Sequence, residues 1–121
     1  MAQVLVVDDS ASVREEVADY LRSHGMTVDI AVDGLDGLEK LKADPSIRLV
    51  VCDLNMPDMD GLTMVEKVRD VLRNSTVIIV MLTTEYSPAM TIRGRVSGVK
   101  GWIVKPFKGE AVLATFKKLA E

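Results

Sequence analysis

Short, uninterrupted hydrophobic runs alternate along the chain with longer stretches in which hydrophobic residues recur every three or four positions. The short runs are rich in β-branched residues, which is typical of strands buried on both faces of a parallel sheet. They occupy residues 4–7, 49–52, 77–82 and, more briefly, 102–104. The stretch 27–32 also has strand character but includes Asp29, as expected of a strand at the edge of a sheet. The pattern therefore predicts five strands.

The stretches that follow these strands have the spacing of amphipathic helices. Residues suited to helix caps and ends lie at Ser10, Asp33, Asp60, Ser87-Pro88 and His24-Gly25. The expected core-facing positions are, helix by helix, Val13, Val17, Tyr20 and Leu21; Leu35, Leu38 and Leu41; Leu62, Val65, Val68 and Leu72; and, in a fifth helix, Val112, Phe116 and Leu119. Gly94 falls inside the fourth helix, where glycine costs about 1 kcal/mol relative to alanine. We therefore expect that helix to be loose.

A strand followed by a helix, repeated five times, predicts an α/β fold with a five-stranded parallel sheet. Right-handed crossovers place helices on both faces, so the sheet is doubly wound, in flavodoxin-like order. No linker, low-complexity tract or further repeat interrupts residues 1–121. We therefore expect one domain over 1–121 and no output domain.

Composition narrows the class of protein. The chain has 121 residues, 48% of them hydrophobic, and a net charge of only −3, which gives no overall attraction to nucleic acid. The run 77–82 is too short for membrane insertion, and a single cysteine excludes an internal disulfide. These features predict a soluble cytoplasmic protein. Residues 1–60 carry a charge of −8 and residues 61–121 one of +5, which indicates two faces with different roles.

Polar residues gather where the predicted strands end. Along the chain they are Asp8-Asp9, Asp53, Thr83-Thr84-Glu85 and Lys105-Pro106. The carboxyl ends of parallel strands share one edge of the sheet, and binding sites form there at the switch point between the first and third strands. Three carboxylates, a hydroxyl and an ammonium group are therefore expected to meet at one site.

Three adjacent carboxylates repel one another unless a cation or a proton joins them. A hard divalent cation with oxygen ligands suits such a site, and Mg²⁺ keeps several waters in an open one. Such an ion neutralises phosphoryl oxygens during in-line transfer, while Lys105 pairs with the remaining charge and Thr83 donates a hydrogen bond. Asp53 ends the central strand and is the best candidate for the phosphoryl acceptor.

Each of these residues also has an ordinary structural interpretation. Asp8-Asp9 alone could be a solvated strand end, and Asp58 and Asp60 are better explained as loop and capping acids than as ligands. Cys52 points away from Asp53 along its strand and is expected to be a small buried hydrophobe. The acid cluster as a whole, rather than any single residue, carries the functional interpretation.

The motifs resemble those of response-regulator receiver domains of two-component systems, in particular single-domain chemotaxis regulators of the CheY type. The similarity rests on residues 6–10, residues 53–61, Thr83 and residues 101–107, in order and at the expected strand ends. Each motif alone is weak evidence for the family, but together the motifs extend over nearly the whole chain. The resemblance implies the (βα)5 CheY-like fold.

The resemblance also implies roles for individual residues. Asp53 would be the phosphoacceptor, and Mg²⁺ would be bound by Asp9, Asp53 and the backbone carbonyl of Asn55, with Asp8 acting largely through water. Thr83 and Lys105 would hold the phosphoryl group, and the Lys105-Pro106 peptide would be cis. Thr83 and Trp102 would form the conformational switch.

The implied function is signalling rather than enzymatic turnover, apart from self-catalysed phosphorylation and dephosphorylation. A histidine kinase would donate the phosphoryl group, and a downstream protein, such as a flagellar motor switch component or a relay partner, would bind the phosphorylated monomer. The family's output region here is basic, which favours an acidic, partly helical partner segment. Its cations are Arg93, Arg95, Lys100, Lys108, Lys117 and Lys118.

By the same resemblance, two residues near the phosphoryl group indicate a short-lived phosphorylated state, whereas a third residue indicates a longer-lived one. Asn55 and Glu85 match CheY-type residues, whereas Thr84 stands where the family usually has a smaller side chain. A branched side chain at this position would hinder the attacking water.

Two rival functions share part of the pattern. A flavodoxin-like cofactor binder would need a phosphate-binding loop after the first strand, where Asp8-Asp9 would instead repel a phosphate. A haloacid-dehalogenase-like phosphatase also uses aspartate and Mg²⁺, but it would carry its nucleophile on the first strand and usually a cap insertion. Neither feature is evident in the sequence.

Overall fold

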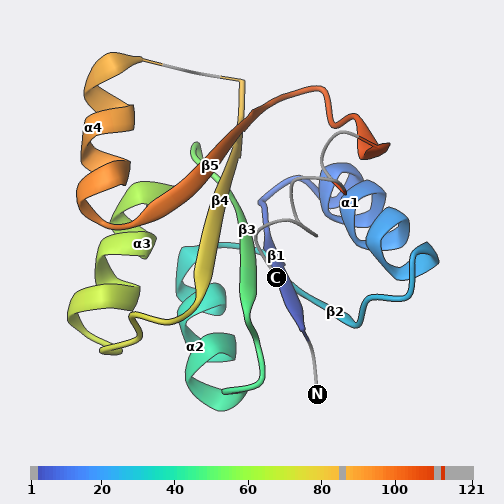
Figure 1. The fold of residues 1–121 in the computed structure, drawn as a ribbon, viewed down its shortest axis with the longest axis horizontal. Coiled ribbons are helices and arrows are strands. Elements are labelled where there is room, and N and C mark those ends of the chain that lie inside the picture. Colours follow the sequence, from blue (N-terminus) through green and yellow to red (C-terminus); the bar gives the residue numbers. More distant parts are fainter. Residues whose placement is uncertain (1–2, 85–86, 111–112, 114–121) are drawn as a thin grey trace.

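In the computed structural model, residues 3–84, 87–110 and 113 are described, and they form a five-stranded parallel sheet with helices on both sides (Figure 1). The strands run in the order β2-β1-β3-β4-β5. Their bounds are β1 Val4–Val7, β2 Val28–Ala31, β3 Leu49–Asp53, β4 Ile78–Thr83 and β5 Val99–Val104. The predicted α/β class, strand order and flavodoxin-like arrangement are confirmed.

The hydrophobic character of each strand matches its place in the sheet. The continuous apolar runs form β1, β3 and β4 at the centre, where burial on both faces leaves almost no room for polar side chains. The predicted edge strand is β2, which carries the half-buried Asp29. At the other edge, β5 begins three residues earlier than predicted, because Lys100 and Gly101 interrupt the hydrophobic pattern while the strand stays paired with β4 through an irregularity at Lys100.

The described helices begin at the predicted caps. They are α1 Ala11–Ser23, α2 Gly34–Ala43, α3 Gly61–Asp70 and α4 Pro88–Val96. The side chains of Asp33 and Asp60 each accept a hydrogen bond from the backbone N–H three residues later at 2.8 Å, and Ser87 does so at 3.2 Å. Ser10 caps α1 in the same way, and His24 closes that helix. The fifth predicted helix, with Val112, Phe116 and Leu119, lies outside the described residues.

Two hydrophobic clusters fill the space between the sheet and its helices. One packs α2, α3 and part of α4 against one face, and the other packs α1 and Leu113 against the opposite face. Figure 1 shows α1 on its own side of the sheet, with α2, α3 and α4 together on the other. Both clusters include residues of β1, β3 and β4, so these central strands are buried on both faces of the sheet.

The prediction that Leu35 faces the core is wrong, because its side chain is 61% exposed. The side of α2 that packs inward is formed by Gly34, Gly37 and Leu41, with Leu38 partly buried beside them. These positions are spaced by three or four residues and leave Leu35 at the margin of the helix.

Gly94 has a packing role that its low helix propensity did not indicate. It is the buried residue of α4, and a Cβ atom at this position would lie only 2.7 Å from Cζ2 of Trp102. The indole therefore lies directly against the helix backbone, on the sheet face that also carries α2 and α3. A larger residue at 94 would push the helix and Trp102 apart.

Candidate functional site

Three carboxylates meet at the carboxyl ends of β1 and β3, as predicted. Val7 pairs with Cys52 in the sheet, so Asp8 and Asp53 follow on adjacent strands at the same level. Oxygen atoms from Asp8, Asp9 and Asp53 all lie within 4.8 Å of one another. Asp8 and Asp53 are only 1% and 5% exposed, whereas Asp9 is open to solvent. The cluster thus has two buried acids and one that reaches the surface.

Lys105 provides the positive charge at this cluster. Its Nζ lies 3.1 Å from Oδ1 of Asp53 and 3.3 Å from Oδ2 of Asp8. The residue follows β5, and its backbone N–H donates to the carbonyl of Thr83 at 2.8 Å, which ties the loop to the end of β4. The Lys105-Pro106 peptide is cis, as the family resemblance implied.

The negative charge of the three carboxylates at the site is only partly balanced by the ammonium group of Lys105. Burial, followed by the charge of Asp8, raises the pKa of Asp53 to about 6 against the hydrogen bond from Lys105. Burial lowers the pKa of Lys105, but its hydrogen bond to Asp53 and the nearby acids outweigh this, so that pKa is raised overall. The lysine therefore stays charged and only partly offsets the repulsion between the carboxylates.

The donor set fits a hard divalent cation. All side-chain donors are carboxylate oxygens, which is the ligand type that Mg²⁺ and Ca²⁺ prefer. Oδ2 of Asp8 is buried and accepts no hydrogen bond from the residues that the structure describes, although it forms an ion pair with Lys105. A buried carboxylate oxygen without a hydrogen bond carries a desolvation cost that a bound cation would relieve. Asn55 lies in the exposed loop just after β3.

Two residues that sequence reasoning did not assign a role hold the cluster in place. Nη1 of Arg14, on α1, donates to the backbone carbonyl of Asp8 at 2.6 Å. Gly61 approaches β3 so closely that a Cβ atom there would overlap the carbonyl oxygen of Asp53, while its N–H donates to Leu54 at 2.8 Å. Gly61 was visible in the motif 53–61, but the need for a glycine depends on a contact across the loop.

The predicted switch residues lie on β4 and β5. Thr83 ends β4 and is fully buried, and the preceding residue, Leu82, pairs with Asp53 of β3. Thr84 comes next and is exposed. Trp102 is half-buried, next to Gly94 of α4. Glu85, which was predicted to lie near the phosphoryl group, is outside the described residues.

The ordinary structural interpretations of three nearby residues are confirmed. Cys52 is fully buried, and burial together with Asp53 raises the pKa of its thiol far above the usual range, so the thiol is inert. Asp60 caps α3. Asp58 lies in the loop in a left-handed conformation and is exposed.

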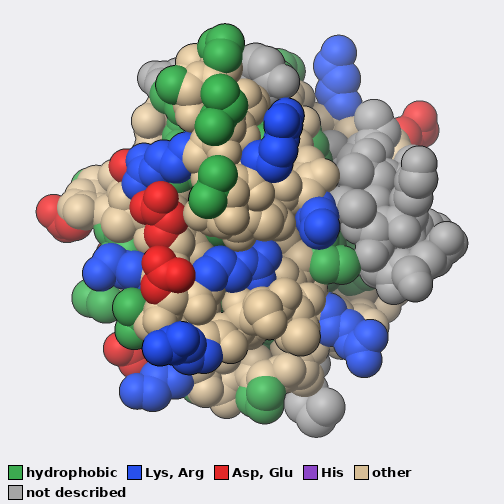
Figure 2. Space-filling view, turned by 60° about the vertical axis from the view of Figure 1, so that its left-hand side comes forward, with side chains coloured by type: hydrophobic (Ala, Val, Ile, Leu, Met, Phe, Trp, Pro, Cys, Tyr) green, Lys and Arg blue, Asp and Glu red, His purple; other side chains and the backbone are tan. Residues whose placement is uncertain are grey.

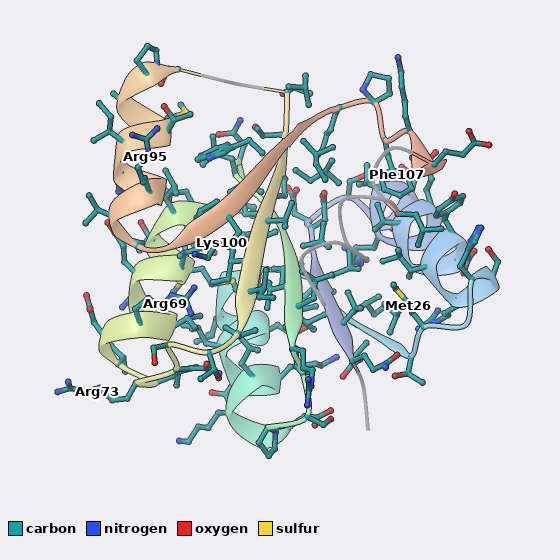
Figure 3. The ribbon with its side chains drawn as sticks, in the orientation of Figure 1. Met26, Arg69, Arg73, Arg95, Lys100 and Phe107 are labelled. Atoms are coloured by element: carbon teal, nitrogen blue, oxygen red, sulfur yellow. The ribbon has the colours of Figure 1, made fainter. Side chains whose placement is uncertain are left out.

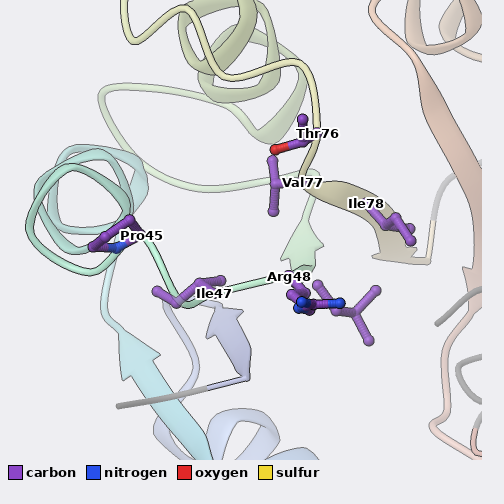
Figure 4. A pocket seen from close by; sticks show the side chains of 7 residues that line it. Pro45, Ile47, Arg48, Thr76, Val77 and Ile78 are labelled. Carbon is purple, nitrogen blue, oxygen red and sulfur yellow. The ribbon is translucent and has the colours of Figure 1, made fainter.

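A separate cavity of about 400 Å³ lies at the opposite end of the sheet (Figure 4). Its lining comes from the segments that lead into β3 and β4: Pro45, Ile47, Arg48, Leu49, Thr76, Val77 and Ile78. The strands are parallel, so this cavity is at their amino ends, away from the acid cluster. No helix in the described part of the chain is long and apolar enough to cross a membrane.

Comparisons with known proteins agree with this geometry. Residues 4–117 match the response regulator receiver domain family. The chain is 41% identical to the chemotaxis protein CheY of Treponema pallidum over 113 residues, which are 92% of this chain and 77% of that protein.

Solved structures give the same result. The chemotaxis protein CheY4 of Vibrio cholerae is 40% identical, with a TM-score of 0.90 over 98% of both chains. The response regulator TrrA of Thermotoga maritima, in complex with Mg²⁺-BeF, is 27% identical, with a TM-score of 0.86 over 98% of this chain and 99% of that one.

Both the fold and the family similarity cover nearly the whole chain, so the prediction of a two-component receiver domain of the CheY type is confirmed. The two rival functions, a flavodoxin-like cofactor binder and a haloacid-dehalogenase-like phosphatase, share only parts of this pattern. The chain belongs to the family of response-regulator receiver domains.

Proposed function

We propose that this receiver is a chemotaxis switch in which Asp53 accepts a phosphoryl group in a Mg²⁺-dependent reaction. Receiver domains are signalling domains that take their phosphoryl group from a histidine kinase and use a metal in the acidic site. The observation that carries the proposal is the convergence of Asp8, Asp9, Asp53 and Lys105 at one edge of the sheet. The chemotaxis assignment is supported by the similarity to CheY proteins from two bacteria.

The chemistry follows from the positions of the side chains. A carboxylate oxygen of Asp53 forms the new bond to phosphorus as the bond to the histidine nitrogen of the kinase breaks, and that nitrogen keeps the electron pair. Lys105, already 3.1 Å from Asp53, pairs with the charge on the phosphoryl oxygens, and the Thr83 hydroxyl donates to another. Water later attacks the phosphorus of the acyl phosphate, and the bond to Asp53 breaks, which releases inorganic phosphate and returns Asp53 to its carboxylate.

Metal binding would involve the open side of the cluster. We assign Asp9, Asp53 and the backbone carbonyl of Asn55 as direct ligands, with Asp8 acting through water. When bound, Mg²⁺ supplies the positive charge that lets a phosphate approach carboxylates. The exposure of Asp9 keeps this side accessible, and the burial of Asp8 suits an indirect role.

Output would occur through the surface of α4 and β5. Exposed cations there are Arg95 and Lys100, with Lys108 just after the strand, and Figure 2 shows basic and hydrophobic side chains together on the face of the molecule that carries α4. The exposed apolar residues are Ile92, Val96 and Val104. A mixed basic and apolar surface fits an acidic amphipathic helix, such as one from a motor switch component or a relay protein.

The phosphoacceptor assignment is tested by labelling with a small-molecule phosphodonor and Mg²⁺. We expect one phosphoryl group per chain, located by mass spectrometry at Asp53, and no label in Asp53→Asn. Asp58→Asn is the matched control, because it removes an exposed carboxylate from the neighbouring loop and should label normally. Undiminished labelling of Asp53→Asn, or labelling in excess chelator, contradicts the assignment.

A further inference from the structure

Few hydrophobic contacts hold α4 to the other residues that the structure describes. Gly94 is its buried residue, and Met90 is only partly buried. Ile92 and Val96 point outward, with exposed fractions of 60% and 85%. Since a helix of nine residues has little stability of its own, α4 depends on tertiary contacts for its position. Hydrogen bonds and an ion pair to α3 supply many of the contacts that position α4.

The first polar link joins the middle of α4 to α3. Nε of Arg93 donates to Oε2 of Glu66 at 3.0 Å, and Nη2 donates to Oε1 at 2.6 Å. Nη2 also lies 3.2 Å from Oγ1 of Thr63. The guanidinium and carboxylate thus pair through two parallel hydrogen bonds, the geometry that gives an exposed ion pair the most directional strength. A shift of α4 along or around its axis would break at least one of these bonds.

The second polar link fixes the C-terminal end of α4. Arg69 of α3, labelled in Figure 3, donates from Nε to the carbonyl of Ser97 at 2.9 Å and from Nη2 to that of Gly98 at 3.5 Å. Its Nη1 donates to Asn74 and Val77, each at 3.0 Å. One guanidinium therefore binds the end of α4 to the loop before β4, and it has the charge that a helix C-terminus favours.

The opposite end of α4 lies close in the chain to the proposed phosphorylation site. Ser87, its cap, lies four residues after Thr83, which is placed to contact the phosphoryl group. Because the two residues are so close in the chain, we expect a movement of Thr83 to be passed on to the N-terminal end of α4, while Arg69 holds the C-terminal end. The Arg93–Glu66 pair lies between the two and resists movement of the helix.

We propose that the Arg93–Glu66 pair, with Thr63, is a latch that holds α4 against α3 and sets how readily phosphorylation moves the output face. The proposal rests on the proposed function, since it assumes that Asp53 is the signal input. The latch also means that one cation of the predicted basic surface is not available to a partner while the latch is closed. Arg93 was predicted to belong to it, but Glu66 now occupies its guanidinium in the way that a partner's carboxylate would. Opening the latch would release that charge for a partner.

The latch predicts a specific effect of Glu66→Gln on the binding of a phosphoryl analogue. Part of the free energy of beryllofluoride binding is used to open the latch in the parent, so the variant should need less analogue. Exposed ion pairs are worth up to about 1 kcal/mol, so half-saturation should fall by about two- to fivefold. Titration with beryllofluoride in Mg²⁺, followed by the backbone NMR resonances of the acid cluster, measures this shift.

Asp19→Asn is the matched control. Asp19 pairs with Arg22 at 3.8 Å on the exposed side of α1, far from α4, so this variant makes the same change in net charge without touching the latch. Its half-saturation should equal that of the parent. The difference in half-saturating beryllofluoride concentration between the parent and Glu66→Gln should also become smaller at high salt, because salt screens an exposed ion pair.

A second measurement detects the latch directly. The side-chain Nε–H resonance of Arg93, observed by NMR, should shift when beryllofluoride saturates the parent. An unchanged resonance, or a half-saturation for Glu66→Gln equal to or above that of the parent, overturns the latch while leaving Asp53 as the phosphoacceptor. If the parent itself binds no beryllofluoride in Mg²⁺, the proposed function fails, and the latch fails with it.

Discussion

Lys105 Nζ lies 3.1 Å from Oδ1 of Asp53, although the two residues are 52 positions apart in the sequence. This contact connects the loop after β5 to the end of the central strand β3. It places a permanent positive charge beside the carboxylate that we assign as phosphoacceptor. Because two more acids share the site, the pair reduces the repulsion in the cluster without removing it.

Neutralising Asp53 should stabilise the metal-free protein. Asp53 is buried next to Asp8, and the unfavourable burial of its charge outweighs its hydrogen bond to Lys105, as its raised pKa indicates. Asp53→Asn should therefore raise the free energy of unfolding by about 1 kcal/mol in chelator. Urea denaturation at neutral pH measures this change. Added Mg²⁺ should stabilise the parent more than the variant, and the exposed control Asp58→Asn should behave like the parent. A destabilised Asp53→Asn would show that the ion pair with Lys105 dominates.

Removing the hydroxyl of Thr83 should separate phosphorylation from its output. Thr83→Ala keeps Asp53 and Lys105, so we expect normal labelling at Asp53. In the proposed switch, a new hydrogen bond from this hydroxyl to the phosphoryl group distinguishes the two states, so its loss should reduce the fluorescence change of Trp102. Thr83→Ser retains the hydroxyl and should restore much of the response. If adding beryllofluoride to the parent, in Mg²⁺ throughout, leaves Trp102 emission unchanged, Trp102 is a packing residue and the switch lies elsewhere.

The side chain of Thr84 should slow loss of the phosphoryl group. It is exposed and comes directly after the buried Thr83, and a branched side chain there would hinder the attacking water. Thr84→Ala should hydrolyse its acyl phosphate faster than the parent, by about threefold to tenfold if the obstruction costs near 1 kcal/mol. The decay of labelled protein after removal of the phosphodonor gives the rate. An equal or slower rate in the variant means that Thr84 is not the obstruction.

Adding a methyl group at Gly94 should disturb Trp102 rather than strengthen α4. Alanine gains about 1 kcal/mol of helix propensity, but overpacking typically costs about 1–3 kcal/mol. The added Cβ atom would lie 2.7 Å from Cζ2 of the indole, so the clash should dominate. Gly94→Ala should therefore lower the free energy of unfolding by about 1 kcal/mol and shift Trp102 emission even without a phosphoryl analogue. Val96→Ala, at an exposed site on the same helix, should leave the emission unchanged. Stabilisation of Gly94→Ala with unaltered emission would show that the indole moves aside easily.

The sequence by itself determined the strands and helices that the structure describes and the membership of the acid cluster. Buried β-branched runs, capping residues and the strand–helix alternation are local features, and each acts over a few residues. Asp8, Asp9 and Asp53 were predictable because polar residues that directly follow neighbouring parallel strands must lie at one edge of the sheet. That rule needs only the strand order, which right-handed crossovers restrict to few possibilities.

Tertiary structure decided the contacts that depend on how the helices sit on the sheet and on one another. The exposure of Leu35, the contact between Gly94 and Trp102, and the pairing of Arg93 with Glu66 across 27 residues all follow from helix placement. In the sequence, Arg93 was one exposed cation among several. Hydrophobic periodicity specifies which side of a helix is buried, but the rotation and separation of two helices are set by the packing of all their side chains at once. That is why the site could be located from local patterns, whereas the polar links that hold α4 beside it could not.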